Sequence, residues 1–161
     1  FKYSKENMKY LERAINFLPV RKAIEFRNHS WSLPFVTNYL TEKGVAQVNV
    51  DVPLLDELFP PLSKVTSKIG YFRMHGRSID RWWNYKEPHE RYDYMYSQEE
   101  LKEISQRINT AIDENPGMEE MYIFFNNHYN AKAVRNAIQM AGILGIEIKK
   151  PLWQDSLFSQ G

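Results

Sequence analysis

Apolar side chains recur every three or four residues in four segments of the chain, which is the period of a helix with one buried face. Three segments begin at a residue that can cap a helix amino terminus, namely Ser4, Ser32 and Asn130. The fourth begins with the capping-box sequence SQEE at 97–100. Proline or glycine follows each segment, so the sequence predicts helices over 4–17, 32–44, 97–115 and 130–145.

Four shorter apolar runs alternate with these helices and predict strands over 22–26, 45–52, 69–76 and 120–127. Such alternation is typical of an α/β protein with parallel strands and helical crossovers. Two architectures fit, an open doubly wound sheet and a (β/α)8 barrel. No glycine-rich turn follows a strand, which argues against a dinucleotide-binding sheet. Four strands are too few for a complete barrel, which has about 250 residues.

The connecting segments differ in character. Residues 54–68 are irregular and are interrupted by two prolines. Residues 77–96 are rich in Arg, Trp and Tyr, and a loop of this length is typical of a functional lid, with the aromatics favouring an ordered one. Residues 146–150 are predicted to be a short extended piece, and the tail to 161 to be irregular. No linker divides the chain, so residues 1–161 are predicted to be a single domain.

Composition narrows the classes of function. The 161 residues are 43% hydrophobic and 25% charged, as in a soluble globular domain. The net charge of +1 lacks the basic excess of a dedicated nucleic-acid-binding protein. The absence of cysteine excludes a disulfide scaffold and Cys-ligated metal centres. No apolar run approaches the roughly 20 residues that span a bilayer, so we expect a cytoplasmic protein without a membrane partner.

Each predicted strand is apolar in its first part and polar at its carboxyl end. The polar ends are residues 25–28, 49–51, 73–77 and 126–128. Parallel strands place their carboxyl ends at one side of the sheet, where α/β proteins bind ligands, so we expect the four ends to converge in one pocket. A buried arginine needs a counter-ion, and either Glu25 or Asp51 is expected to pair with Arg73.

Each of these polar residues also has a purely structural explanation. Glu25 and an arginine could form an ion pair that only closes the mouth of the fold, and His75 could be a hydrogen-bonded core residue. The asparagines at 126 and 127 could simply turn the chain, and Trp82 with Trp83 could fill space under the loop. The four histidines have no HxH or HExxH spacing, and no metal site is predicted.

Five motifs in fixed order carry a resemblance to a known family: EFRNHSW (25–31), VDVP (50–53), YFRMHGR (71–77), RYDYMYS (91–97) and FFNNHYNAKA (124–133). In these motifs the chain resembles the YecE-like family over nearly its whole length. The resemblance implies a TIM-barrel fold without an established activity. It also implies that the chain is the C-terminal part of the barrel, strands five to eight. We therefore expect its partner to be the N-terminal barrel half or a second copy of the chain.

The leading hypothesis is a cytoplasmic barrel protein whose mouth binds a small anionic, phosphorylated or carboxylated, or polyhydroxylated ligand, as in a hydrolase or isomerase. The sequence does not identify a cofactor. The acid/base candidates are Glu25, Asp51 and His75. The ligand-binding candidates are arginines, aromatic residues and amides: Arg27, Arg73, Arg77, Trp83, Tyr92, Tyr94, Asn126 and Asn127.

The alternative hypothesis is a non-catalytic module that binds nucleic acid. It would use arginines 73, 77, 81 and 91 together with the aromatic residues between them. The net charge near zero makes nucleic acid the less favoured partner.

Overall fold

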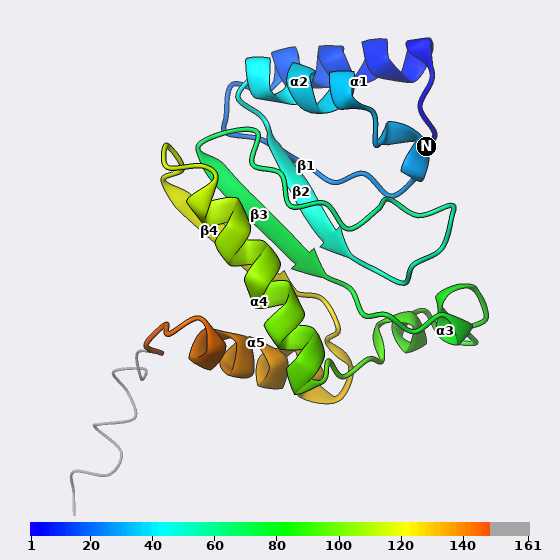
Figure 1. Ribbon diagram of the computed structural model, residues 1–161. Helices are drawn as coiled ribbons and strands as arrows, with labels where there is room; N and C mark the ends of the chain where they lie inside the picture. The colour runs from blue at the N-terminus through cyan, green and yellow to red at the C-terminus, as the bar shows by residue number, and fades with distance from the viewer. Residues whose placement is uncertain (149–161) are drawn as a thin grey trace, which may run out of the picture.

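The computed structural model describes residues 1–148, which form an α/β fold around a single four-stranded sheet (Figure 1). Every neighbouring pair of strands is parallel, and the strand order follows the chain, β1-β2-β3-β4. The strands are β1 (Ala23–Ile24), β2 (Ala46–Asp51), β3 (Ile69–Met74) and β4 (Glu120–Phe125). The predicted parallel sheet is confirmed, although all four strands are shorter than predicted.

Four helices of at least nine residues accompany the strands: α1 (Lys5–Phe17), α2 (Pro34–Glu42), α4 (Gln98–Asp113) and α5 (Lys132–Ile143). Short helices fill the turns: α3 (Asp80–Trp83) and the 3-10 helices η1 (His29–Trp31), η2 (Pro88–Tyr92) and η3 (Tyr129–Ala131). Two of these, α3 and η2, lie within 77–96, which confirms the prediction of an ordered loop. Residues 146–148 have no regular structure, and the rest of the predicted extended piece and tail lie outside the described residues.

Two of the four predicted helix caps are confirmed. The Ser4 hydroxyl accepts a hydrogen bond from the backbone N–H of Asn7 at 3.0 Å. At the start of α4 the Ser97 hydroxyl accepts from the backbone N–H of Glu100, and the Glu100 carboxylate accepts from the backbone N–H of Ser97. These reciprocal bonds satisfy amide groups that the helix itself leaves unpaired.

The other two caps, Ser32 and Asn130, were predicted wrongly. Each residue adopts another local conformation in place of capping a helix. The Ser32 hydroxyl donates to the carbonyl of His29, so it closes η1, and α2 begins later with Pro34 as its first residue. Asn130 has a left-handed backbone, φ +52°, inside η3, and Ala131 precedes α5 without a capping side chain. Short polar residues favour such local conformations over helix capping at a fixed distance.

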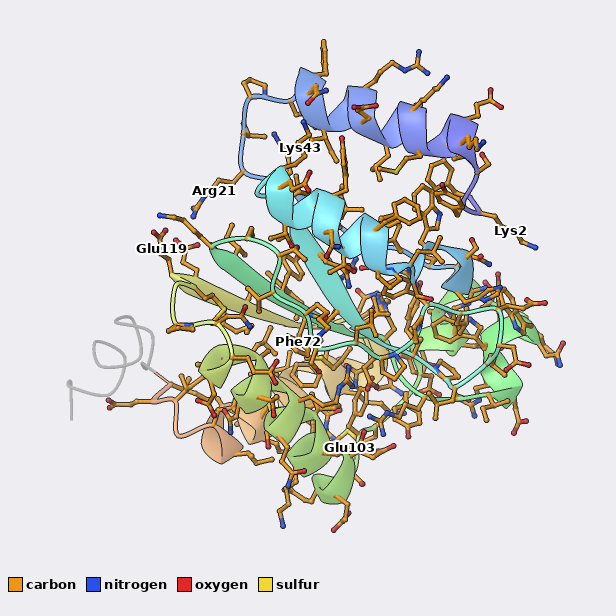
Figure 2. All side chains as sticks on the ribbon, turned by 45° about the horizontal axis from the view of Figure 1, so that its top comes forward. Lys2, Arg21, Lys43, Phe72, Glu103 and Glu119 are labelled. Atoms are coloured by element: carbon orange, nitrogen blue, oxygen red, sulfur yellow. The ribbon has the colours of Figure 1, made fainter. Side chains whose placement is uncertain are left out.

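The helices α2, α4 and α5 lie against one face of the sheet. On this face Phe72 and Met74 pack with Leu101 and Ile104 of α4 and with Met140 of α5. Thr37 of α2 donates to the Gln47 side chain of β2 at 3.2 Å. Figure 2 shows Phe72 in the interior, whereas Lys2, Arg21, Lys43 and Glu119 extend from the surface.

The opposite face carries an aromatic cluster that remains partly uncovered. Tyr71 of β3 stacks on Phe124 of β4 with 5.3 Å between ring centroids, and Tyr122 lies 6.0 Å from Tyr71. Tyr122 and Phe124, both in the edge strand β4, are 38% and 48% exposed, which is a large exposed fraction for aromatic side chains.

The irregular segment before β3 covers part of β2. The Asn49 amide nitrogen donates to the carbonyls of Lys64 and Tyr71, and its oxygen accepts from the backbone N–H of Lys64. Asn49 therefore fixes this segment on the sheet, which explains a polar residue in a buried strand. No helix within residues 1–148 has the length and apolar character needed to cross a membrane.

Candidate functional site

The polar strand ends form two clusters on opposite faces of the sheet. In the register between β2 and β3, Val50 pairs with Arg73 and Asp51 pairs with Met74. Paired residues of parallel strands share a face, so Asp51 lies on the face opposite to Arg73. The sequence predicted that all four strand ends would converge in one pocket. This prediction was wrong for Asp51, because the register places it on the other face of the sheet.

The first cluster surrounds Glu25, which directly follows β1. One carboxylate oxygen accepts from Arg73 Nη1 at 2.6 Å, and the other pairs with Arg27 Nε. Of the two pairings expected for Arg73, the structure has the one with Glu25. His75 Nε2 lies 3.3 Å from Glu25 Oε1, without hydrogen-bonding alignment. His75 Nδ1 lies 3.1 Å from the side-chain nitrogen of Asn126, which can only donate, so the ring proton is on Nε2 and faces Glu25.

These contacts determine the charge state of the cluster. Burial acts to raise the pKa of Glu25, but the contact with His75 and the charges of Arg27 and Arg73 bring it down to about 2. Burial lowers the pKa of His75, and the two arginines lower it further while Glu25 opposes them. At neutral pH the cluster therefore holds an ionised carboxylate beside a neutral imidazole.

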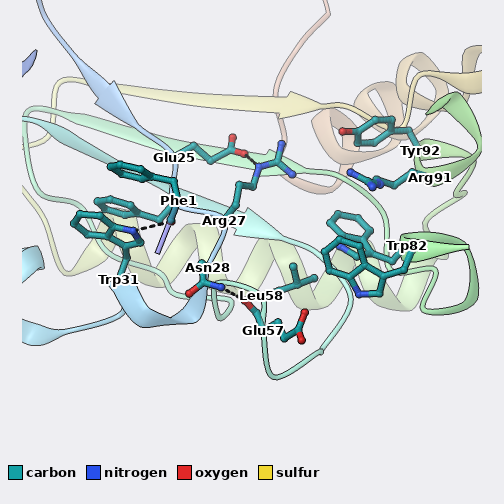
Figure 3. A pocket seen from close by; sticks show the side chains of 12 residues that line it. Phe1, Glu25, Arg27, Asn28, Trp31, Glu57, Leu58, Trp82, Arg91 and Tyr92 are labelled. Carbon is teal, nitrogen blue, oxygen red and sulfur yellow. Dashed lines mark hydrogen bonds and ion pairs between the residues drawn. The ribbon is translucent and has the colours of Figure 1, made fainter. Parts of the chain in front are cut away.

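A pocket of about 450 Å³ opens beside this cluster (Figure 3). Four predicted site residues line it, namely Glu25, Arg27, Trp83 and Tyr92. Arg27 is 45% exposed and Glu25 only 13%, so the arginine reaches further into the open space. The lining residues that the sequence did not single out as ligand contacts include Trp31, Trp82 and Asn28, together with Arg91, which entered only the nucleic-acid hypothesis.

His75 stands behind the pocket rather than in it. Its side chain is fully buried, and the ring of Tyr92 lies 6.1 Å from the imidazole, centroid to centroid. Glu25 therefore lies at the pocket wall, and His75 contacts the far side of the Glu25 carboxylate. Arg73 donates to the Glu25 carboxylate, and the side-chain nitrogen of Asn126 contacts Nδ1 of the His75 ring.

The second cluster surrounds Asp51, which is 2% exposed. Its carboxylate accepts two hydrogen bonds from Arg77, at 2.8 and 2.7 Å, one from Arg107 at 2.9 Å and one from the Tyr96 hydroxyl at 2.9 Å. The hydrogen bond to Asp51 raises the pKa of Arg77, and Glu103 adds to the effect. These partners come from α4 and from the two ends of the 77–96 loop, so the Asp51 carboxylate joins β2 to all of these elements.

Tyr94 and Asn127 lie close to this second cluster and attach the same loop. The Tyr94 hydroxyl donates to Glu100, and burial raises the pKa of that hydroxyl, with Glu100 raising it further. The Asn127 side chain donates to the Tyr94 carbonyl and to the Asn136 side chain, both at 2.8 Å. Asn136 in turn exchanges two hydrogen bonds with the backbone of Tyr96.

The residues that sequence reasoning missed have weak local signals. Arg107 lies between Ile104 and Ile108 on the buried side of α4, a position where an arginine needs a counter-ion. The pocket residue Arg91 lies in the aromatic-rich 77–96 loop, and a sequence pattern does not predict how such an irregular segment folds. Within residues 1–148 no group of three or more His, Asp or Glu side chains is placed to hold a metal ion.

Comparisons with known proteins identify related chains. The sequence model of the family described as "Protein of unknown function DUF72" matches residues 1–159. A crystal structure of a DUF72 family protein from Thermotoga maritima MSB8 is 39% identical, with a TM-score of 0.83 over 90% of this chain. Two crystal structures of a DUF72 family protein from Enterococcus faecalis V583 are 29% and 28% identical, with TM-scores of 0.77 and 0.76 over 94% and 91% of this chain.

The chain covers 54% of the Thermotoga protein and 58% of the Enterococcus protein, so it spans a little over half the length of these solved relatives. No curated protein matches it. The matches agree with the YecE-like resemblance of the five motifs, and the solved relatives share the arrangement of helices around parallel strands.

Proposed function

We propose a function for this chain, which belongs to the DUF72 family. The pocket beside Glu25 binds a small anionic or polyhydroxylated ligand, and Glu25 contacts that ligand directly. The observation that carries the proposal is an ionised carboxylate at the pocket wall, backed by a buried neutral histidine and flanked by two arginines. Buried charges and an unpartnered ring N–H in one place are typical of functional sites.

The chemistry follows from the contacts. The Glu25 carboxylate accepts a hydrogen bond from a ligand hydroxyl, while the buried His75 ring lies 3.3 Å behind the carboxylate. An anionic group on the ligand attracts the exposed Arg27 away from Glu25, and the loss of that positive contact raises the pKa of Glu25. Ligand binding thereby makes Glu25 a stronger proton acceptor, as hydrolysis or isomerisation of a hydroxylated substrate requires.

We also propose that the sheet is the C-terminal part of a (β/α)8 barrel. All of its strands are parallel, and their order never reverses, unlike that of a doubly wound sheet. The helices α2, α4 and α5 lie on one face, and the exposed aromatic cluster of Tyr71, Tyr122 and Phe124 lies on the other, where a barrel has its interior. The greater length of the solved relatives supports the same proposal.

The ion pairs of the candidate phosphate-binding arginines count against nucleic acid as the ligand. Arg73 pairs with Glu25, Arg77 with Asp51 and Glu103, and Arg81 with Asp93. Carboxylates thus neutralise three of the four arginines proposed to contact a phosphate backbone. Binding of an oligonucleotide that falls steeply between low and moderate salt would favour the nucleic-acid hypothesis instead.

A thermal-shift screen of the full-length protein tests the proposal. The screen uses phosphorylated metabolites, organic acids and sugars, with wild type, Glu25→Gln and the control Glu119→Gln in parallel. Glu119 is an exposed carboxylate that pairs only with Lys68 among the described residues. We expect at least one compound to stabilise wild type and the control but not a folded Glu25→Gln protein. Compounds that stabilise all three proteins equally, or no stabilising compound, would contradict the proposal.

A further inference from the structure

The guanidinium of Arg91 lies against a wall of aromatic rings and has no ion pair within residues 1–148. Its central carbon is 4.6 Å from the ring centroid of Tyr85, 5.5 Å from that of Trp82 and 5.7 Å from that of Trp83. The neighbouring Arg81 differs, because it pairs with Asp93. No carboxylate in the described part of the chain therefore lies against Arg91 at the wall of the pocket.

The nitrogen atoms of Arg91 differ in their access to the pocket. Nε is buried and has no hydrogen-bond partner among the described residues. The two terminal nitrogens are also without protein partners in this part of the chain, but they are not buried. Figure 3 shows Arg91 and Arg27 extending toward the same space, from the 77–96 loop and from the end of β1 respectively.

Within residues 1–148 no carboxylate offsets the charge of Arg91, so its guanidinium is available to an anion in the pocket. A partly desolvated cation without a counter-ion is unfavourable, and the attraction of aromatic rings offsets only part of that cost. A guanidinium that lies along aromatic faces directs its N–H groups outward from the ring wall, where they can bind a carboxylate or phosphate with two hydrogen bonds. Arg27 across the pocket adds a second positive charge, since its carboxylate partner is shared with Arg73.

The aromatic surface of the pocket indicates the rest of the ligand. Trp82 is 2% exposed and forms part of the wall behind Arg91, whereas Trp83 is 56% exposed and lines the pocket. Tyr92 lines the pocket beside Arg91. Aromatic rings that line a pocket next to a guanidinium suit an anion with a flat ring of its own.

We infer that Arg91 is a specificity-determining residue of the pocket and that the ligand is a ring-bearing organic anion, a carboxylate or a phosphate monoester. This inference rests on the proposed function, because it assigns the ligand class of the same pocket. The anionic group binds Arg91, with Arg27 nearby, and the ring lies on Trp83 and Tyr92. A ligand hydroxyl then reaches the Glu25 carboxylate.

The test is isothermal titration of the full-length protein with phenyl phosphate, inorganic phosphate and phenol. We expect phenyl phosphate to bind wild type at least tenfold more tightly than either of the other two probes. Arg91→Gln should weaken phenyl phosphate binding at least tenfold, and Arg91→Lys should restore only part of it, because lysine keeps the charge without the two-pronged donor. Arg135→Gln, which removes an exposed arginine of α5, should leave binding unchanged.

The outcomes separate this inference from the proposed function. Equal binding of phenyl phosphate to wild type and to a folded Arg91→Gln protein overturns the inference, as does a wild type that binds phenyl phosphate no better than phosphate. In either case Glu25-dependent binding of another compound in the screen still supports the proposed function. Phenyl phosphate has no hydroxyl group for the Glu25 carboxylate, so its binding tests the anion site alone, whereas the thermal-shift comparison of wild type with Glu25→Gln tests the role of Glu25.

Discussion

Replacing Asp51 with asparagine is expected to destabilise the protein strongly, because this buried carboxylate is the counter-ion of two arginines. The carboxylate accepts four hydrogen bonds, two from Arg77 and one each from Arg107 and Tyr96. The asparagine side chain has nearly the same shape but no charge, so it leaves both guanidinium groups without this partner.

The magnitude can be worked from the burial of the partners. Removing one partner of a buried ion pair costs about 3–5 kcal/mol of the free energy of unfolding. Arg77 is 22% exposed and keeps its hydrogen bonds to Glu103, and Arg107 is 16% exposed, so water and Glu103 offset part of the loss. We therefore expect about 3 kcal/mol, at the lower end of that range.

Urea denaturation of the full-length protein, followed by tryptophan fluorescence, measures this loss. A change of about 3 kcal/mol lowers the urea midpoint by roughly 1–3 M for a protein whose unfolding free energy falls by about 1–3 kcal/mol per molar urea. Glu103→Gln is the matched control, since it removes an exposed carboxylate from the same arginine and should cost at most about 1 kcal/mol. If Asp51→Asn costs no more than Glu103→Gln, Asp51 is not the structural counter-ion described here.

Three further predictions use the same unfolding assay or NMR. Gly76→Ala should destabilise by at least about 1–3 kcal/mol, because Gly76 has φ +100° and an added Cβ would lie 2.6 Å from Cβ of Tyr94; unchanged stability would refute this. The free energy of unfolding should fall as pH drops below about 6.5, because the pKa of His75 is lower in the folded state than in the unfolded state. It should fall further as pH drops from 4.5 toward about 2, because the pKa of Glu25 is lowered to about 2 in the folded state. His75→Asn should flatten the pH dependence between 7 and 5, and an unaltered slope would contradict the account. Arg73→Gln should raise the pKa of Glu25 in a carboxyl NMR titration, whereas an unchanged pKa would show that Arg73 does not stabilise the ionised form.

The local pattern of the sequence predicted much of the fold. Helical periodicity and strand alternation depend on neighbouring residues only, and the parallel sheet follows from their order along the chain. The capping box at 97–100 was predicted correctly because both of its hydrogen bonds join residues three apart. The caps at Ser32 and Asn130 failed because the same local chemistry allowed a turn or a left-handed residue in place of a cap.

The candidate site depended on information that a single sequence does not contain. Alternation placed Arg73 and His75 on the same face, and the need for a counter-ion limited the partner of Arg73 to Glu25 or Asp51. The choice between them depends on the register of β2 against β3, where a shift by one residue would reverse the face of Asp51. The pocket itself joins Glu25 and Arg27 to Arg91, which is more than sixty residues further along the chain, through the fold of the 77–96 loop.

The central claim is that the pocket beside Glu25 is the ligand site of this DUF72 protein. The most direct measurement is a crystal structure of the full-length protein with the compound that gives the largest Glu25-dependent stabilisation in the thermal-shift screen. The account predicts ligand density in this pocket, with an oxygen atom of the ligand within hydrogen-bonding distance of the Glu25 carboxylate and an anionic group at Arg91. Ligand density elsewhere on the protein, with Glu25, Arg27 and Arg73 still paired only with one another, would contradict it.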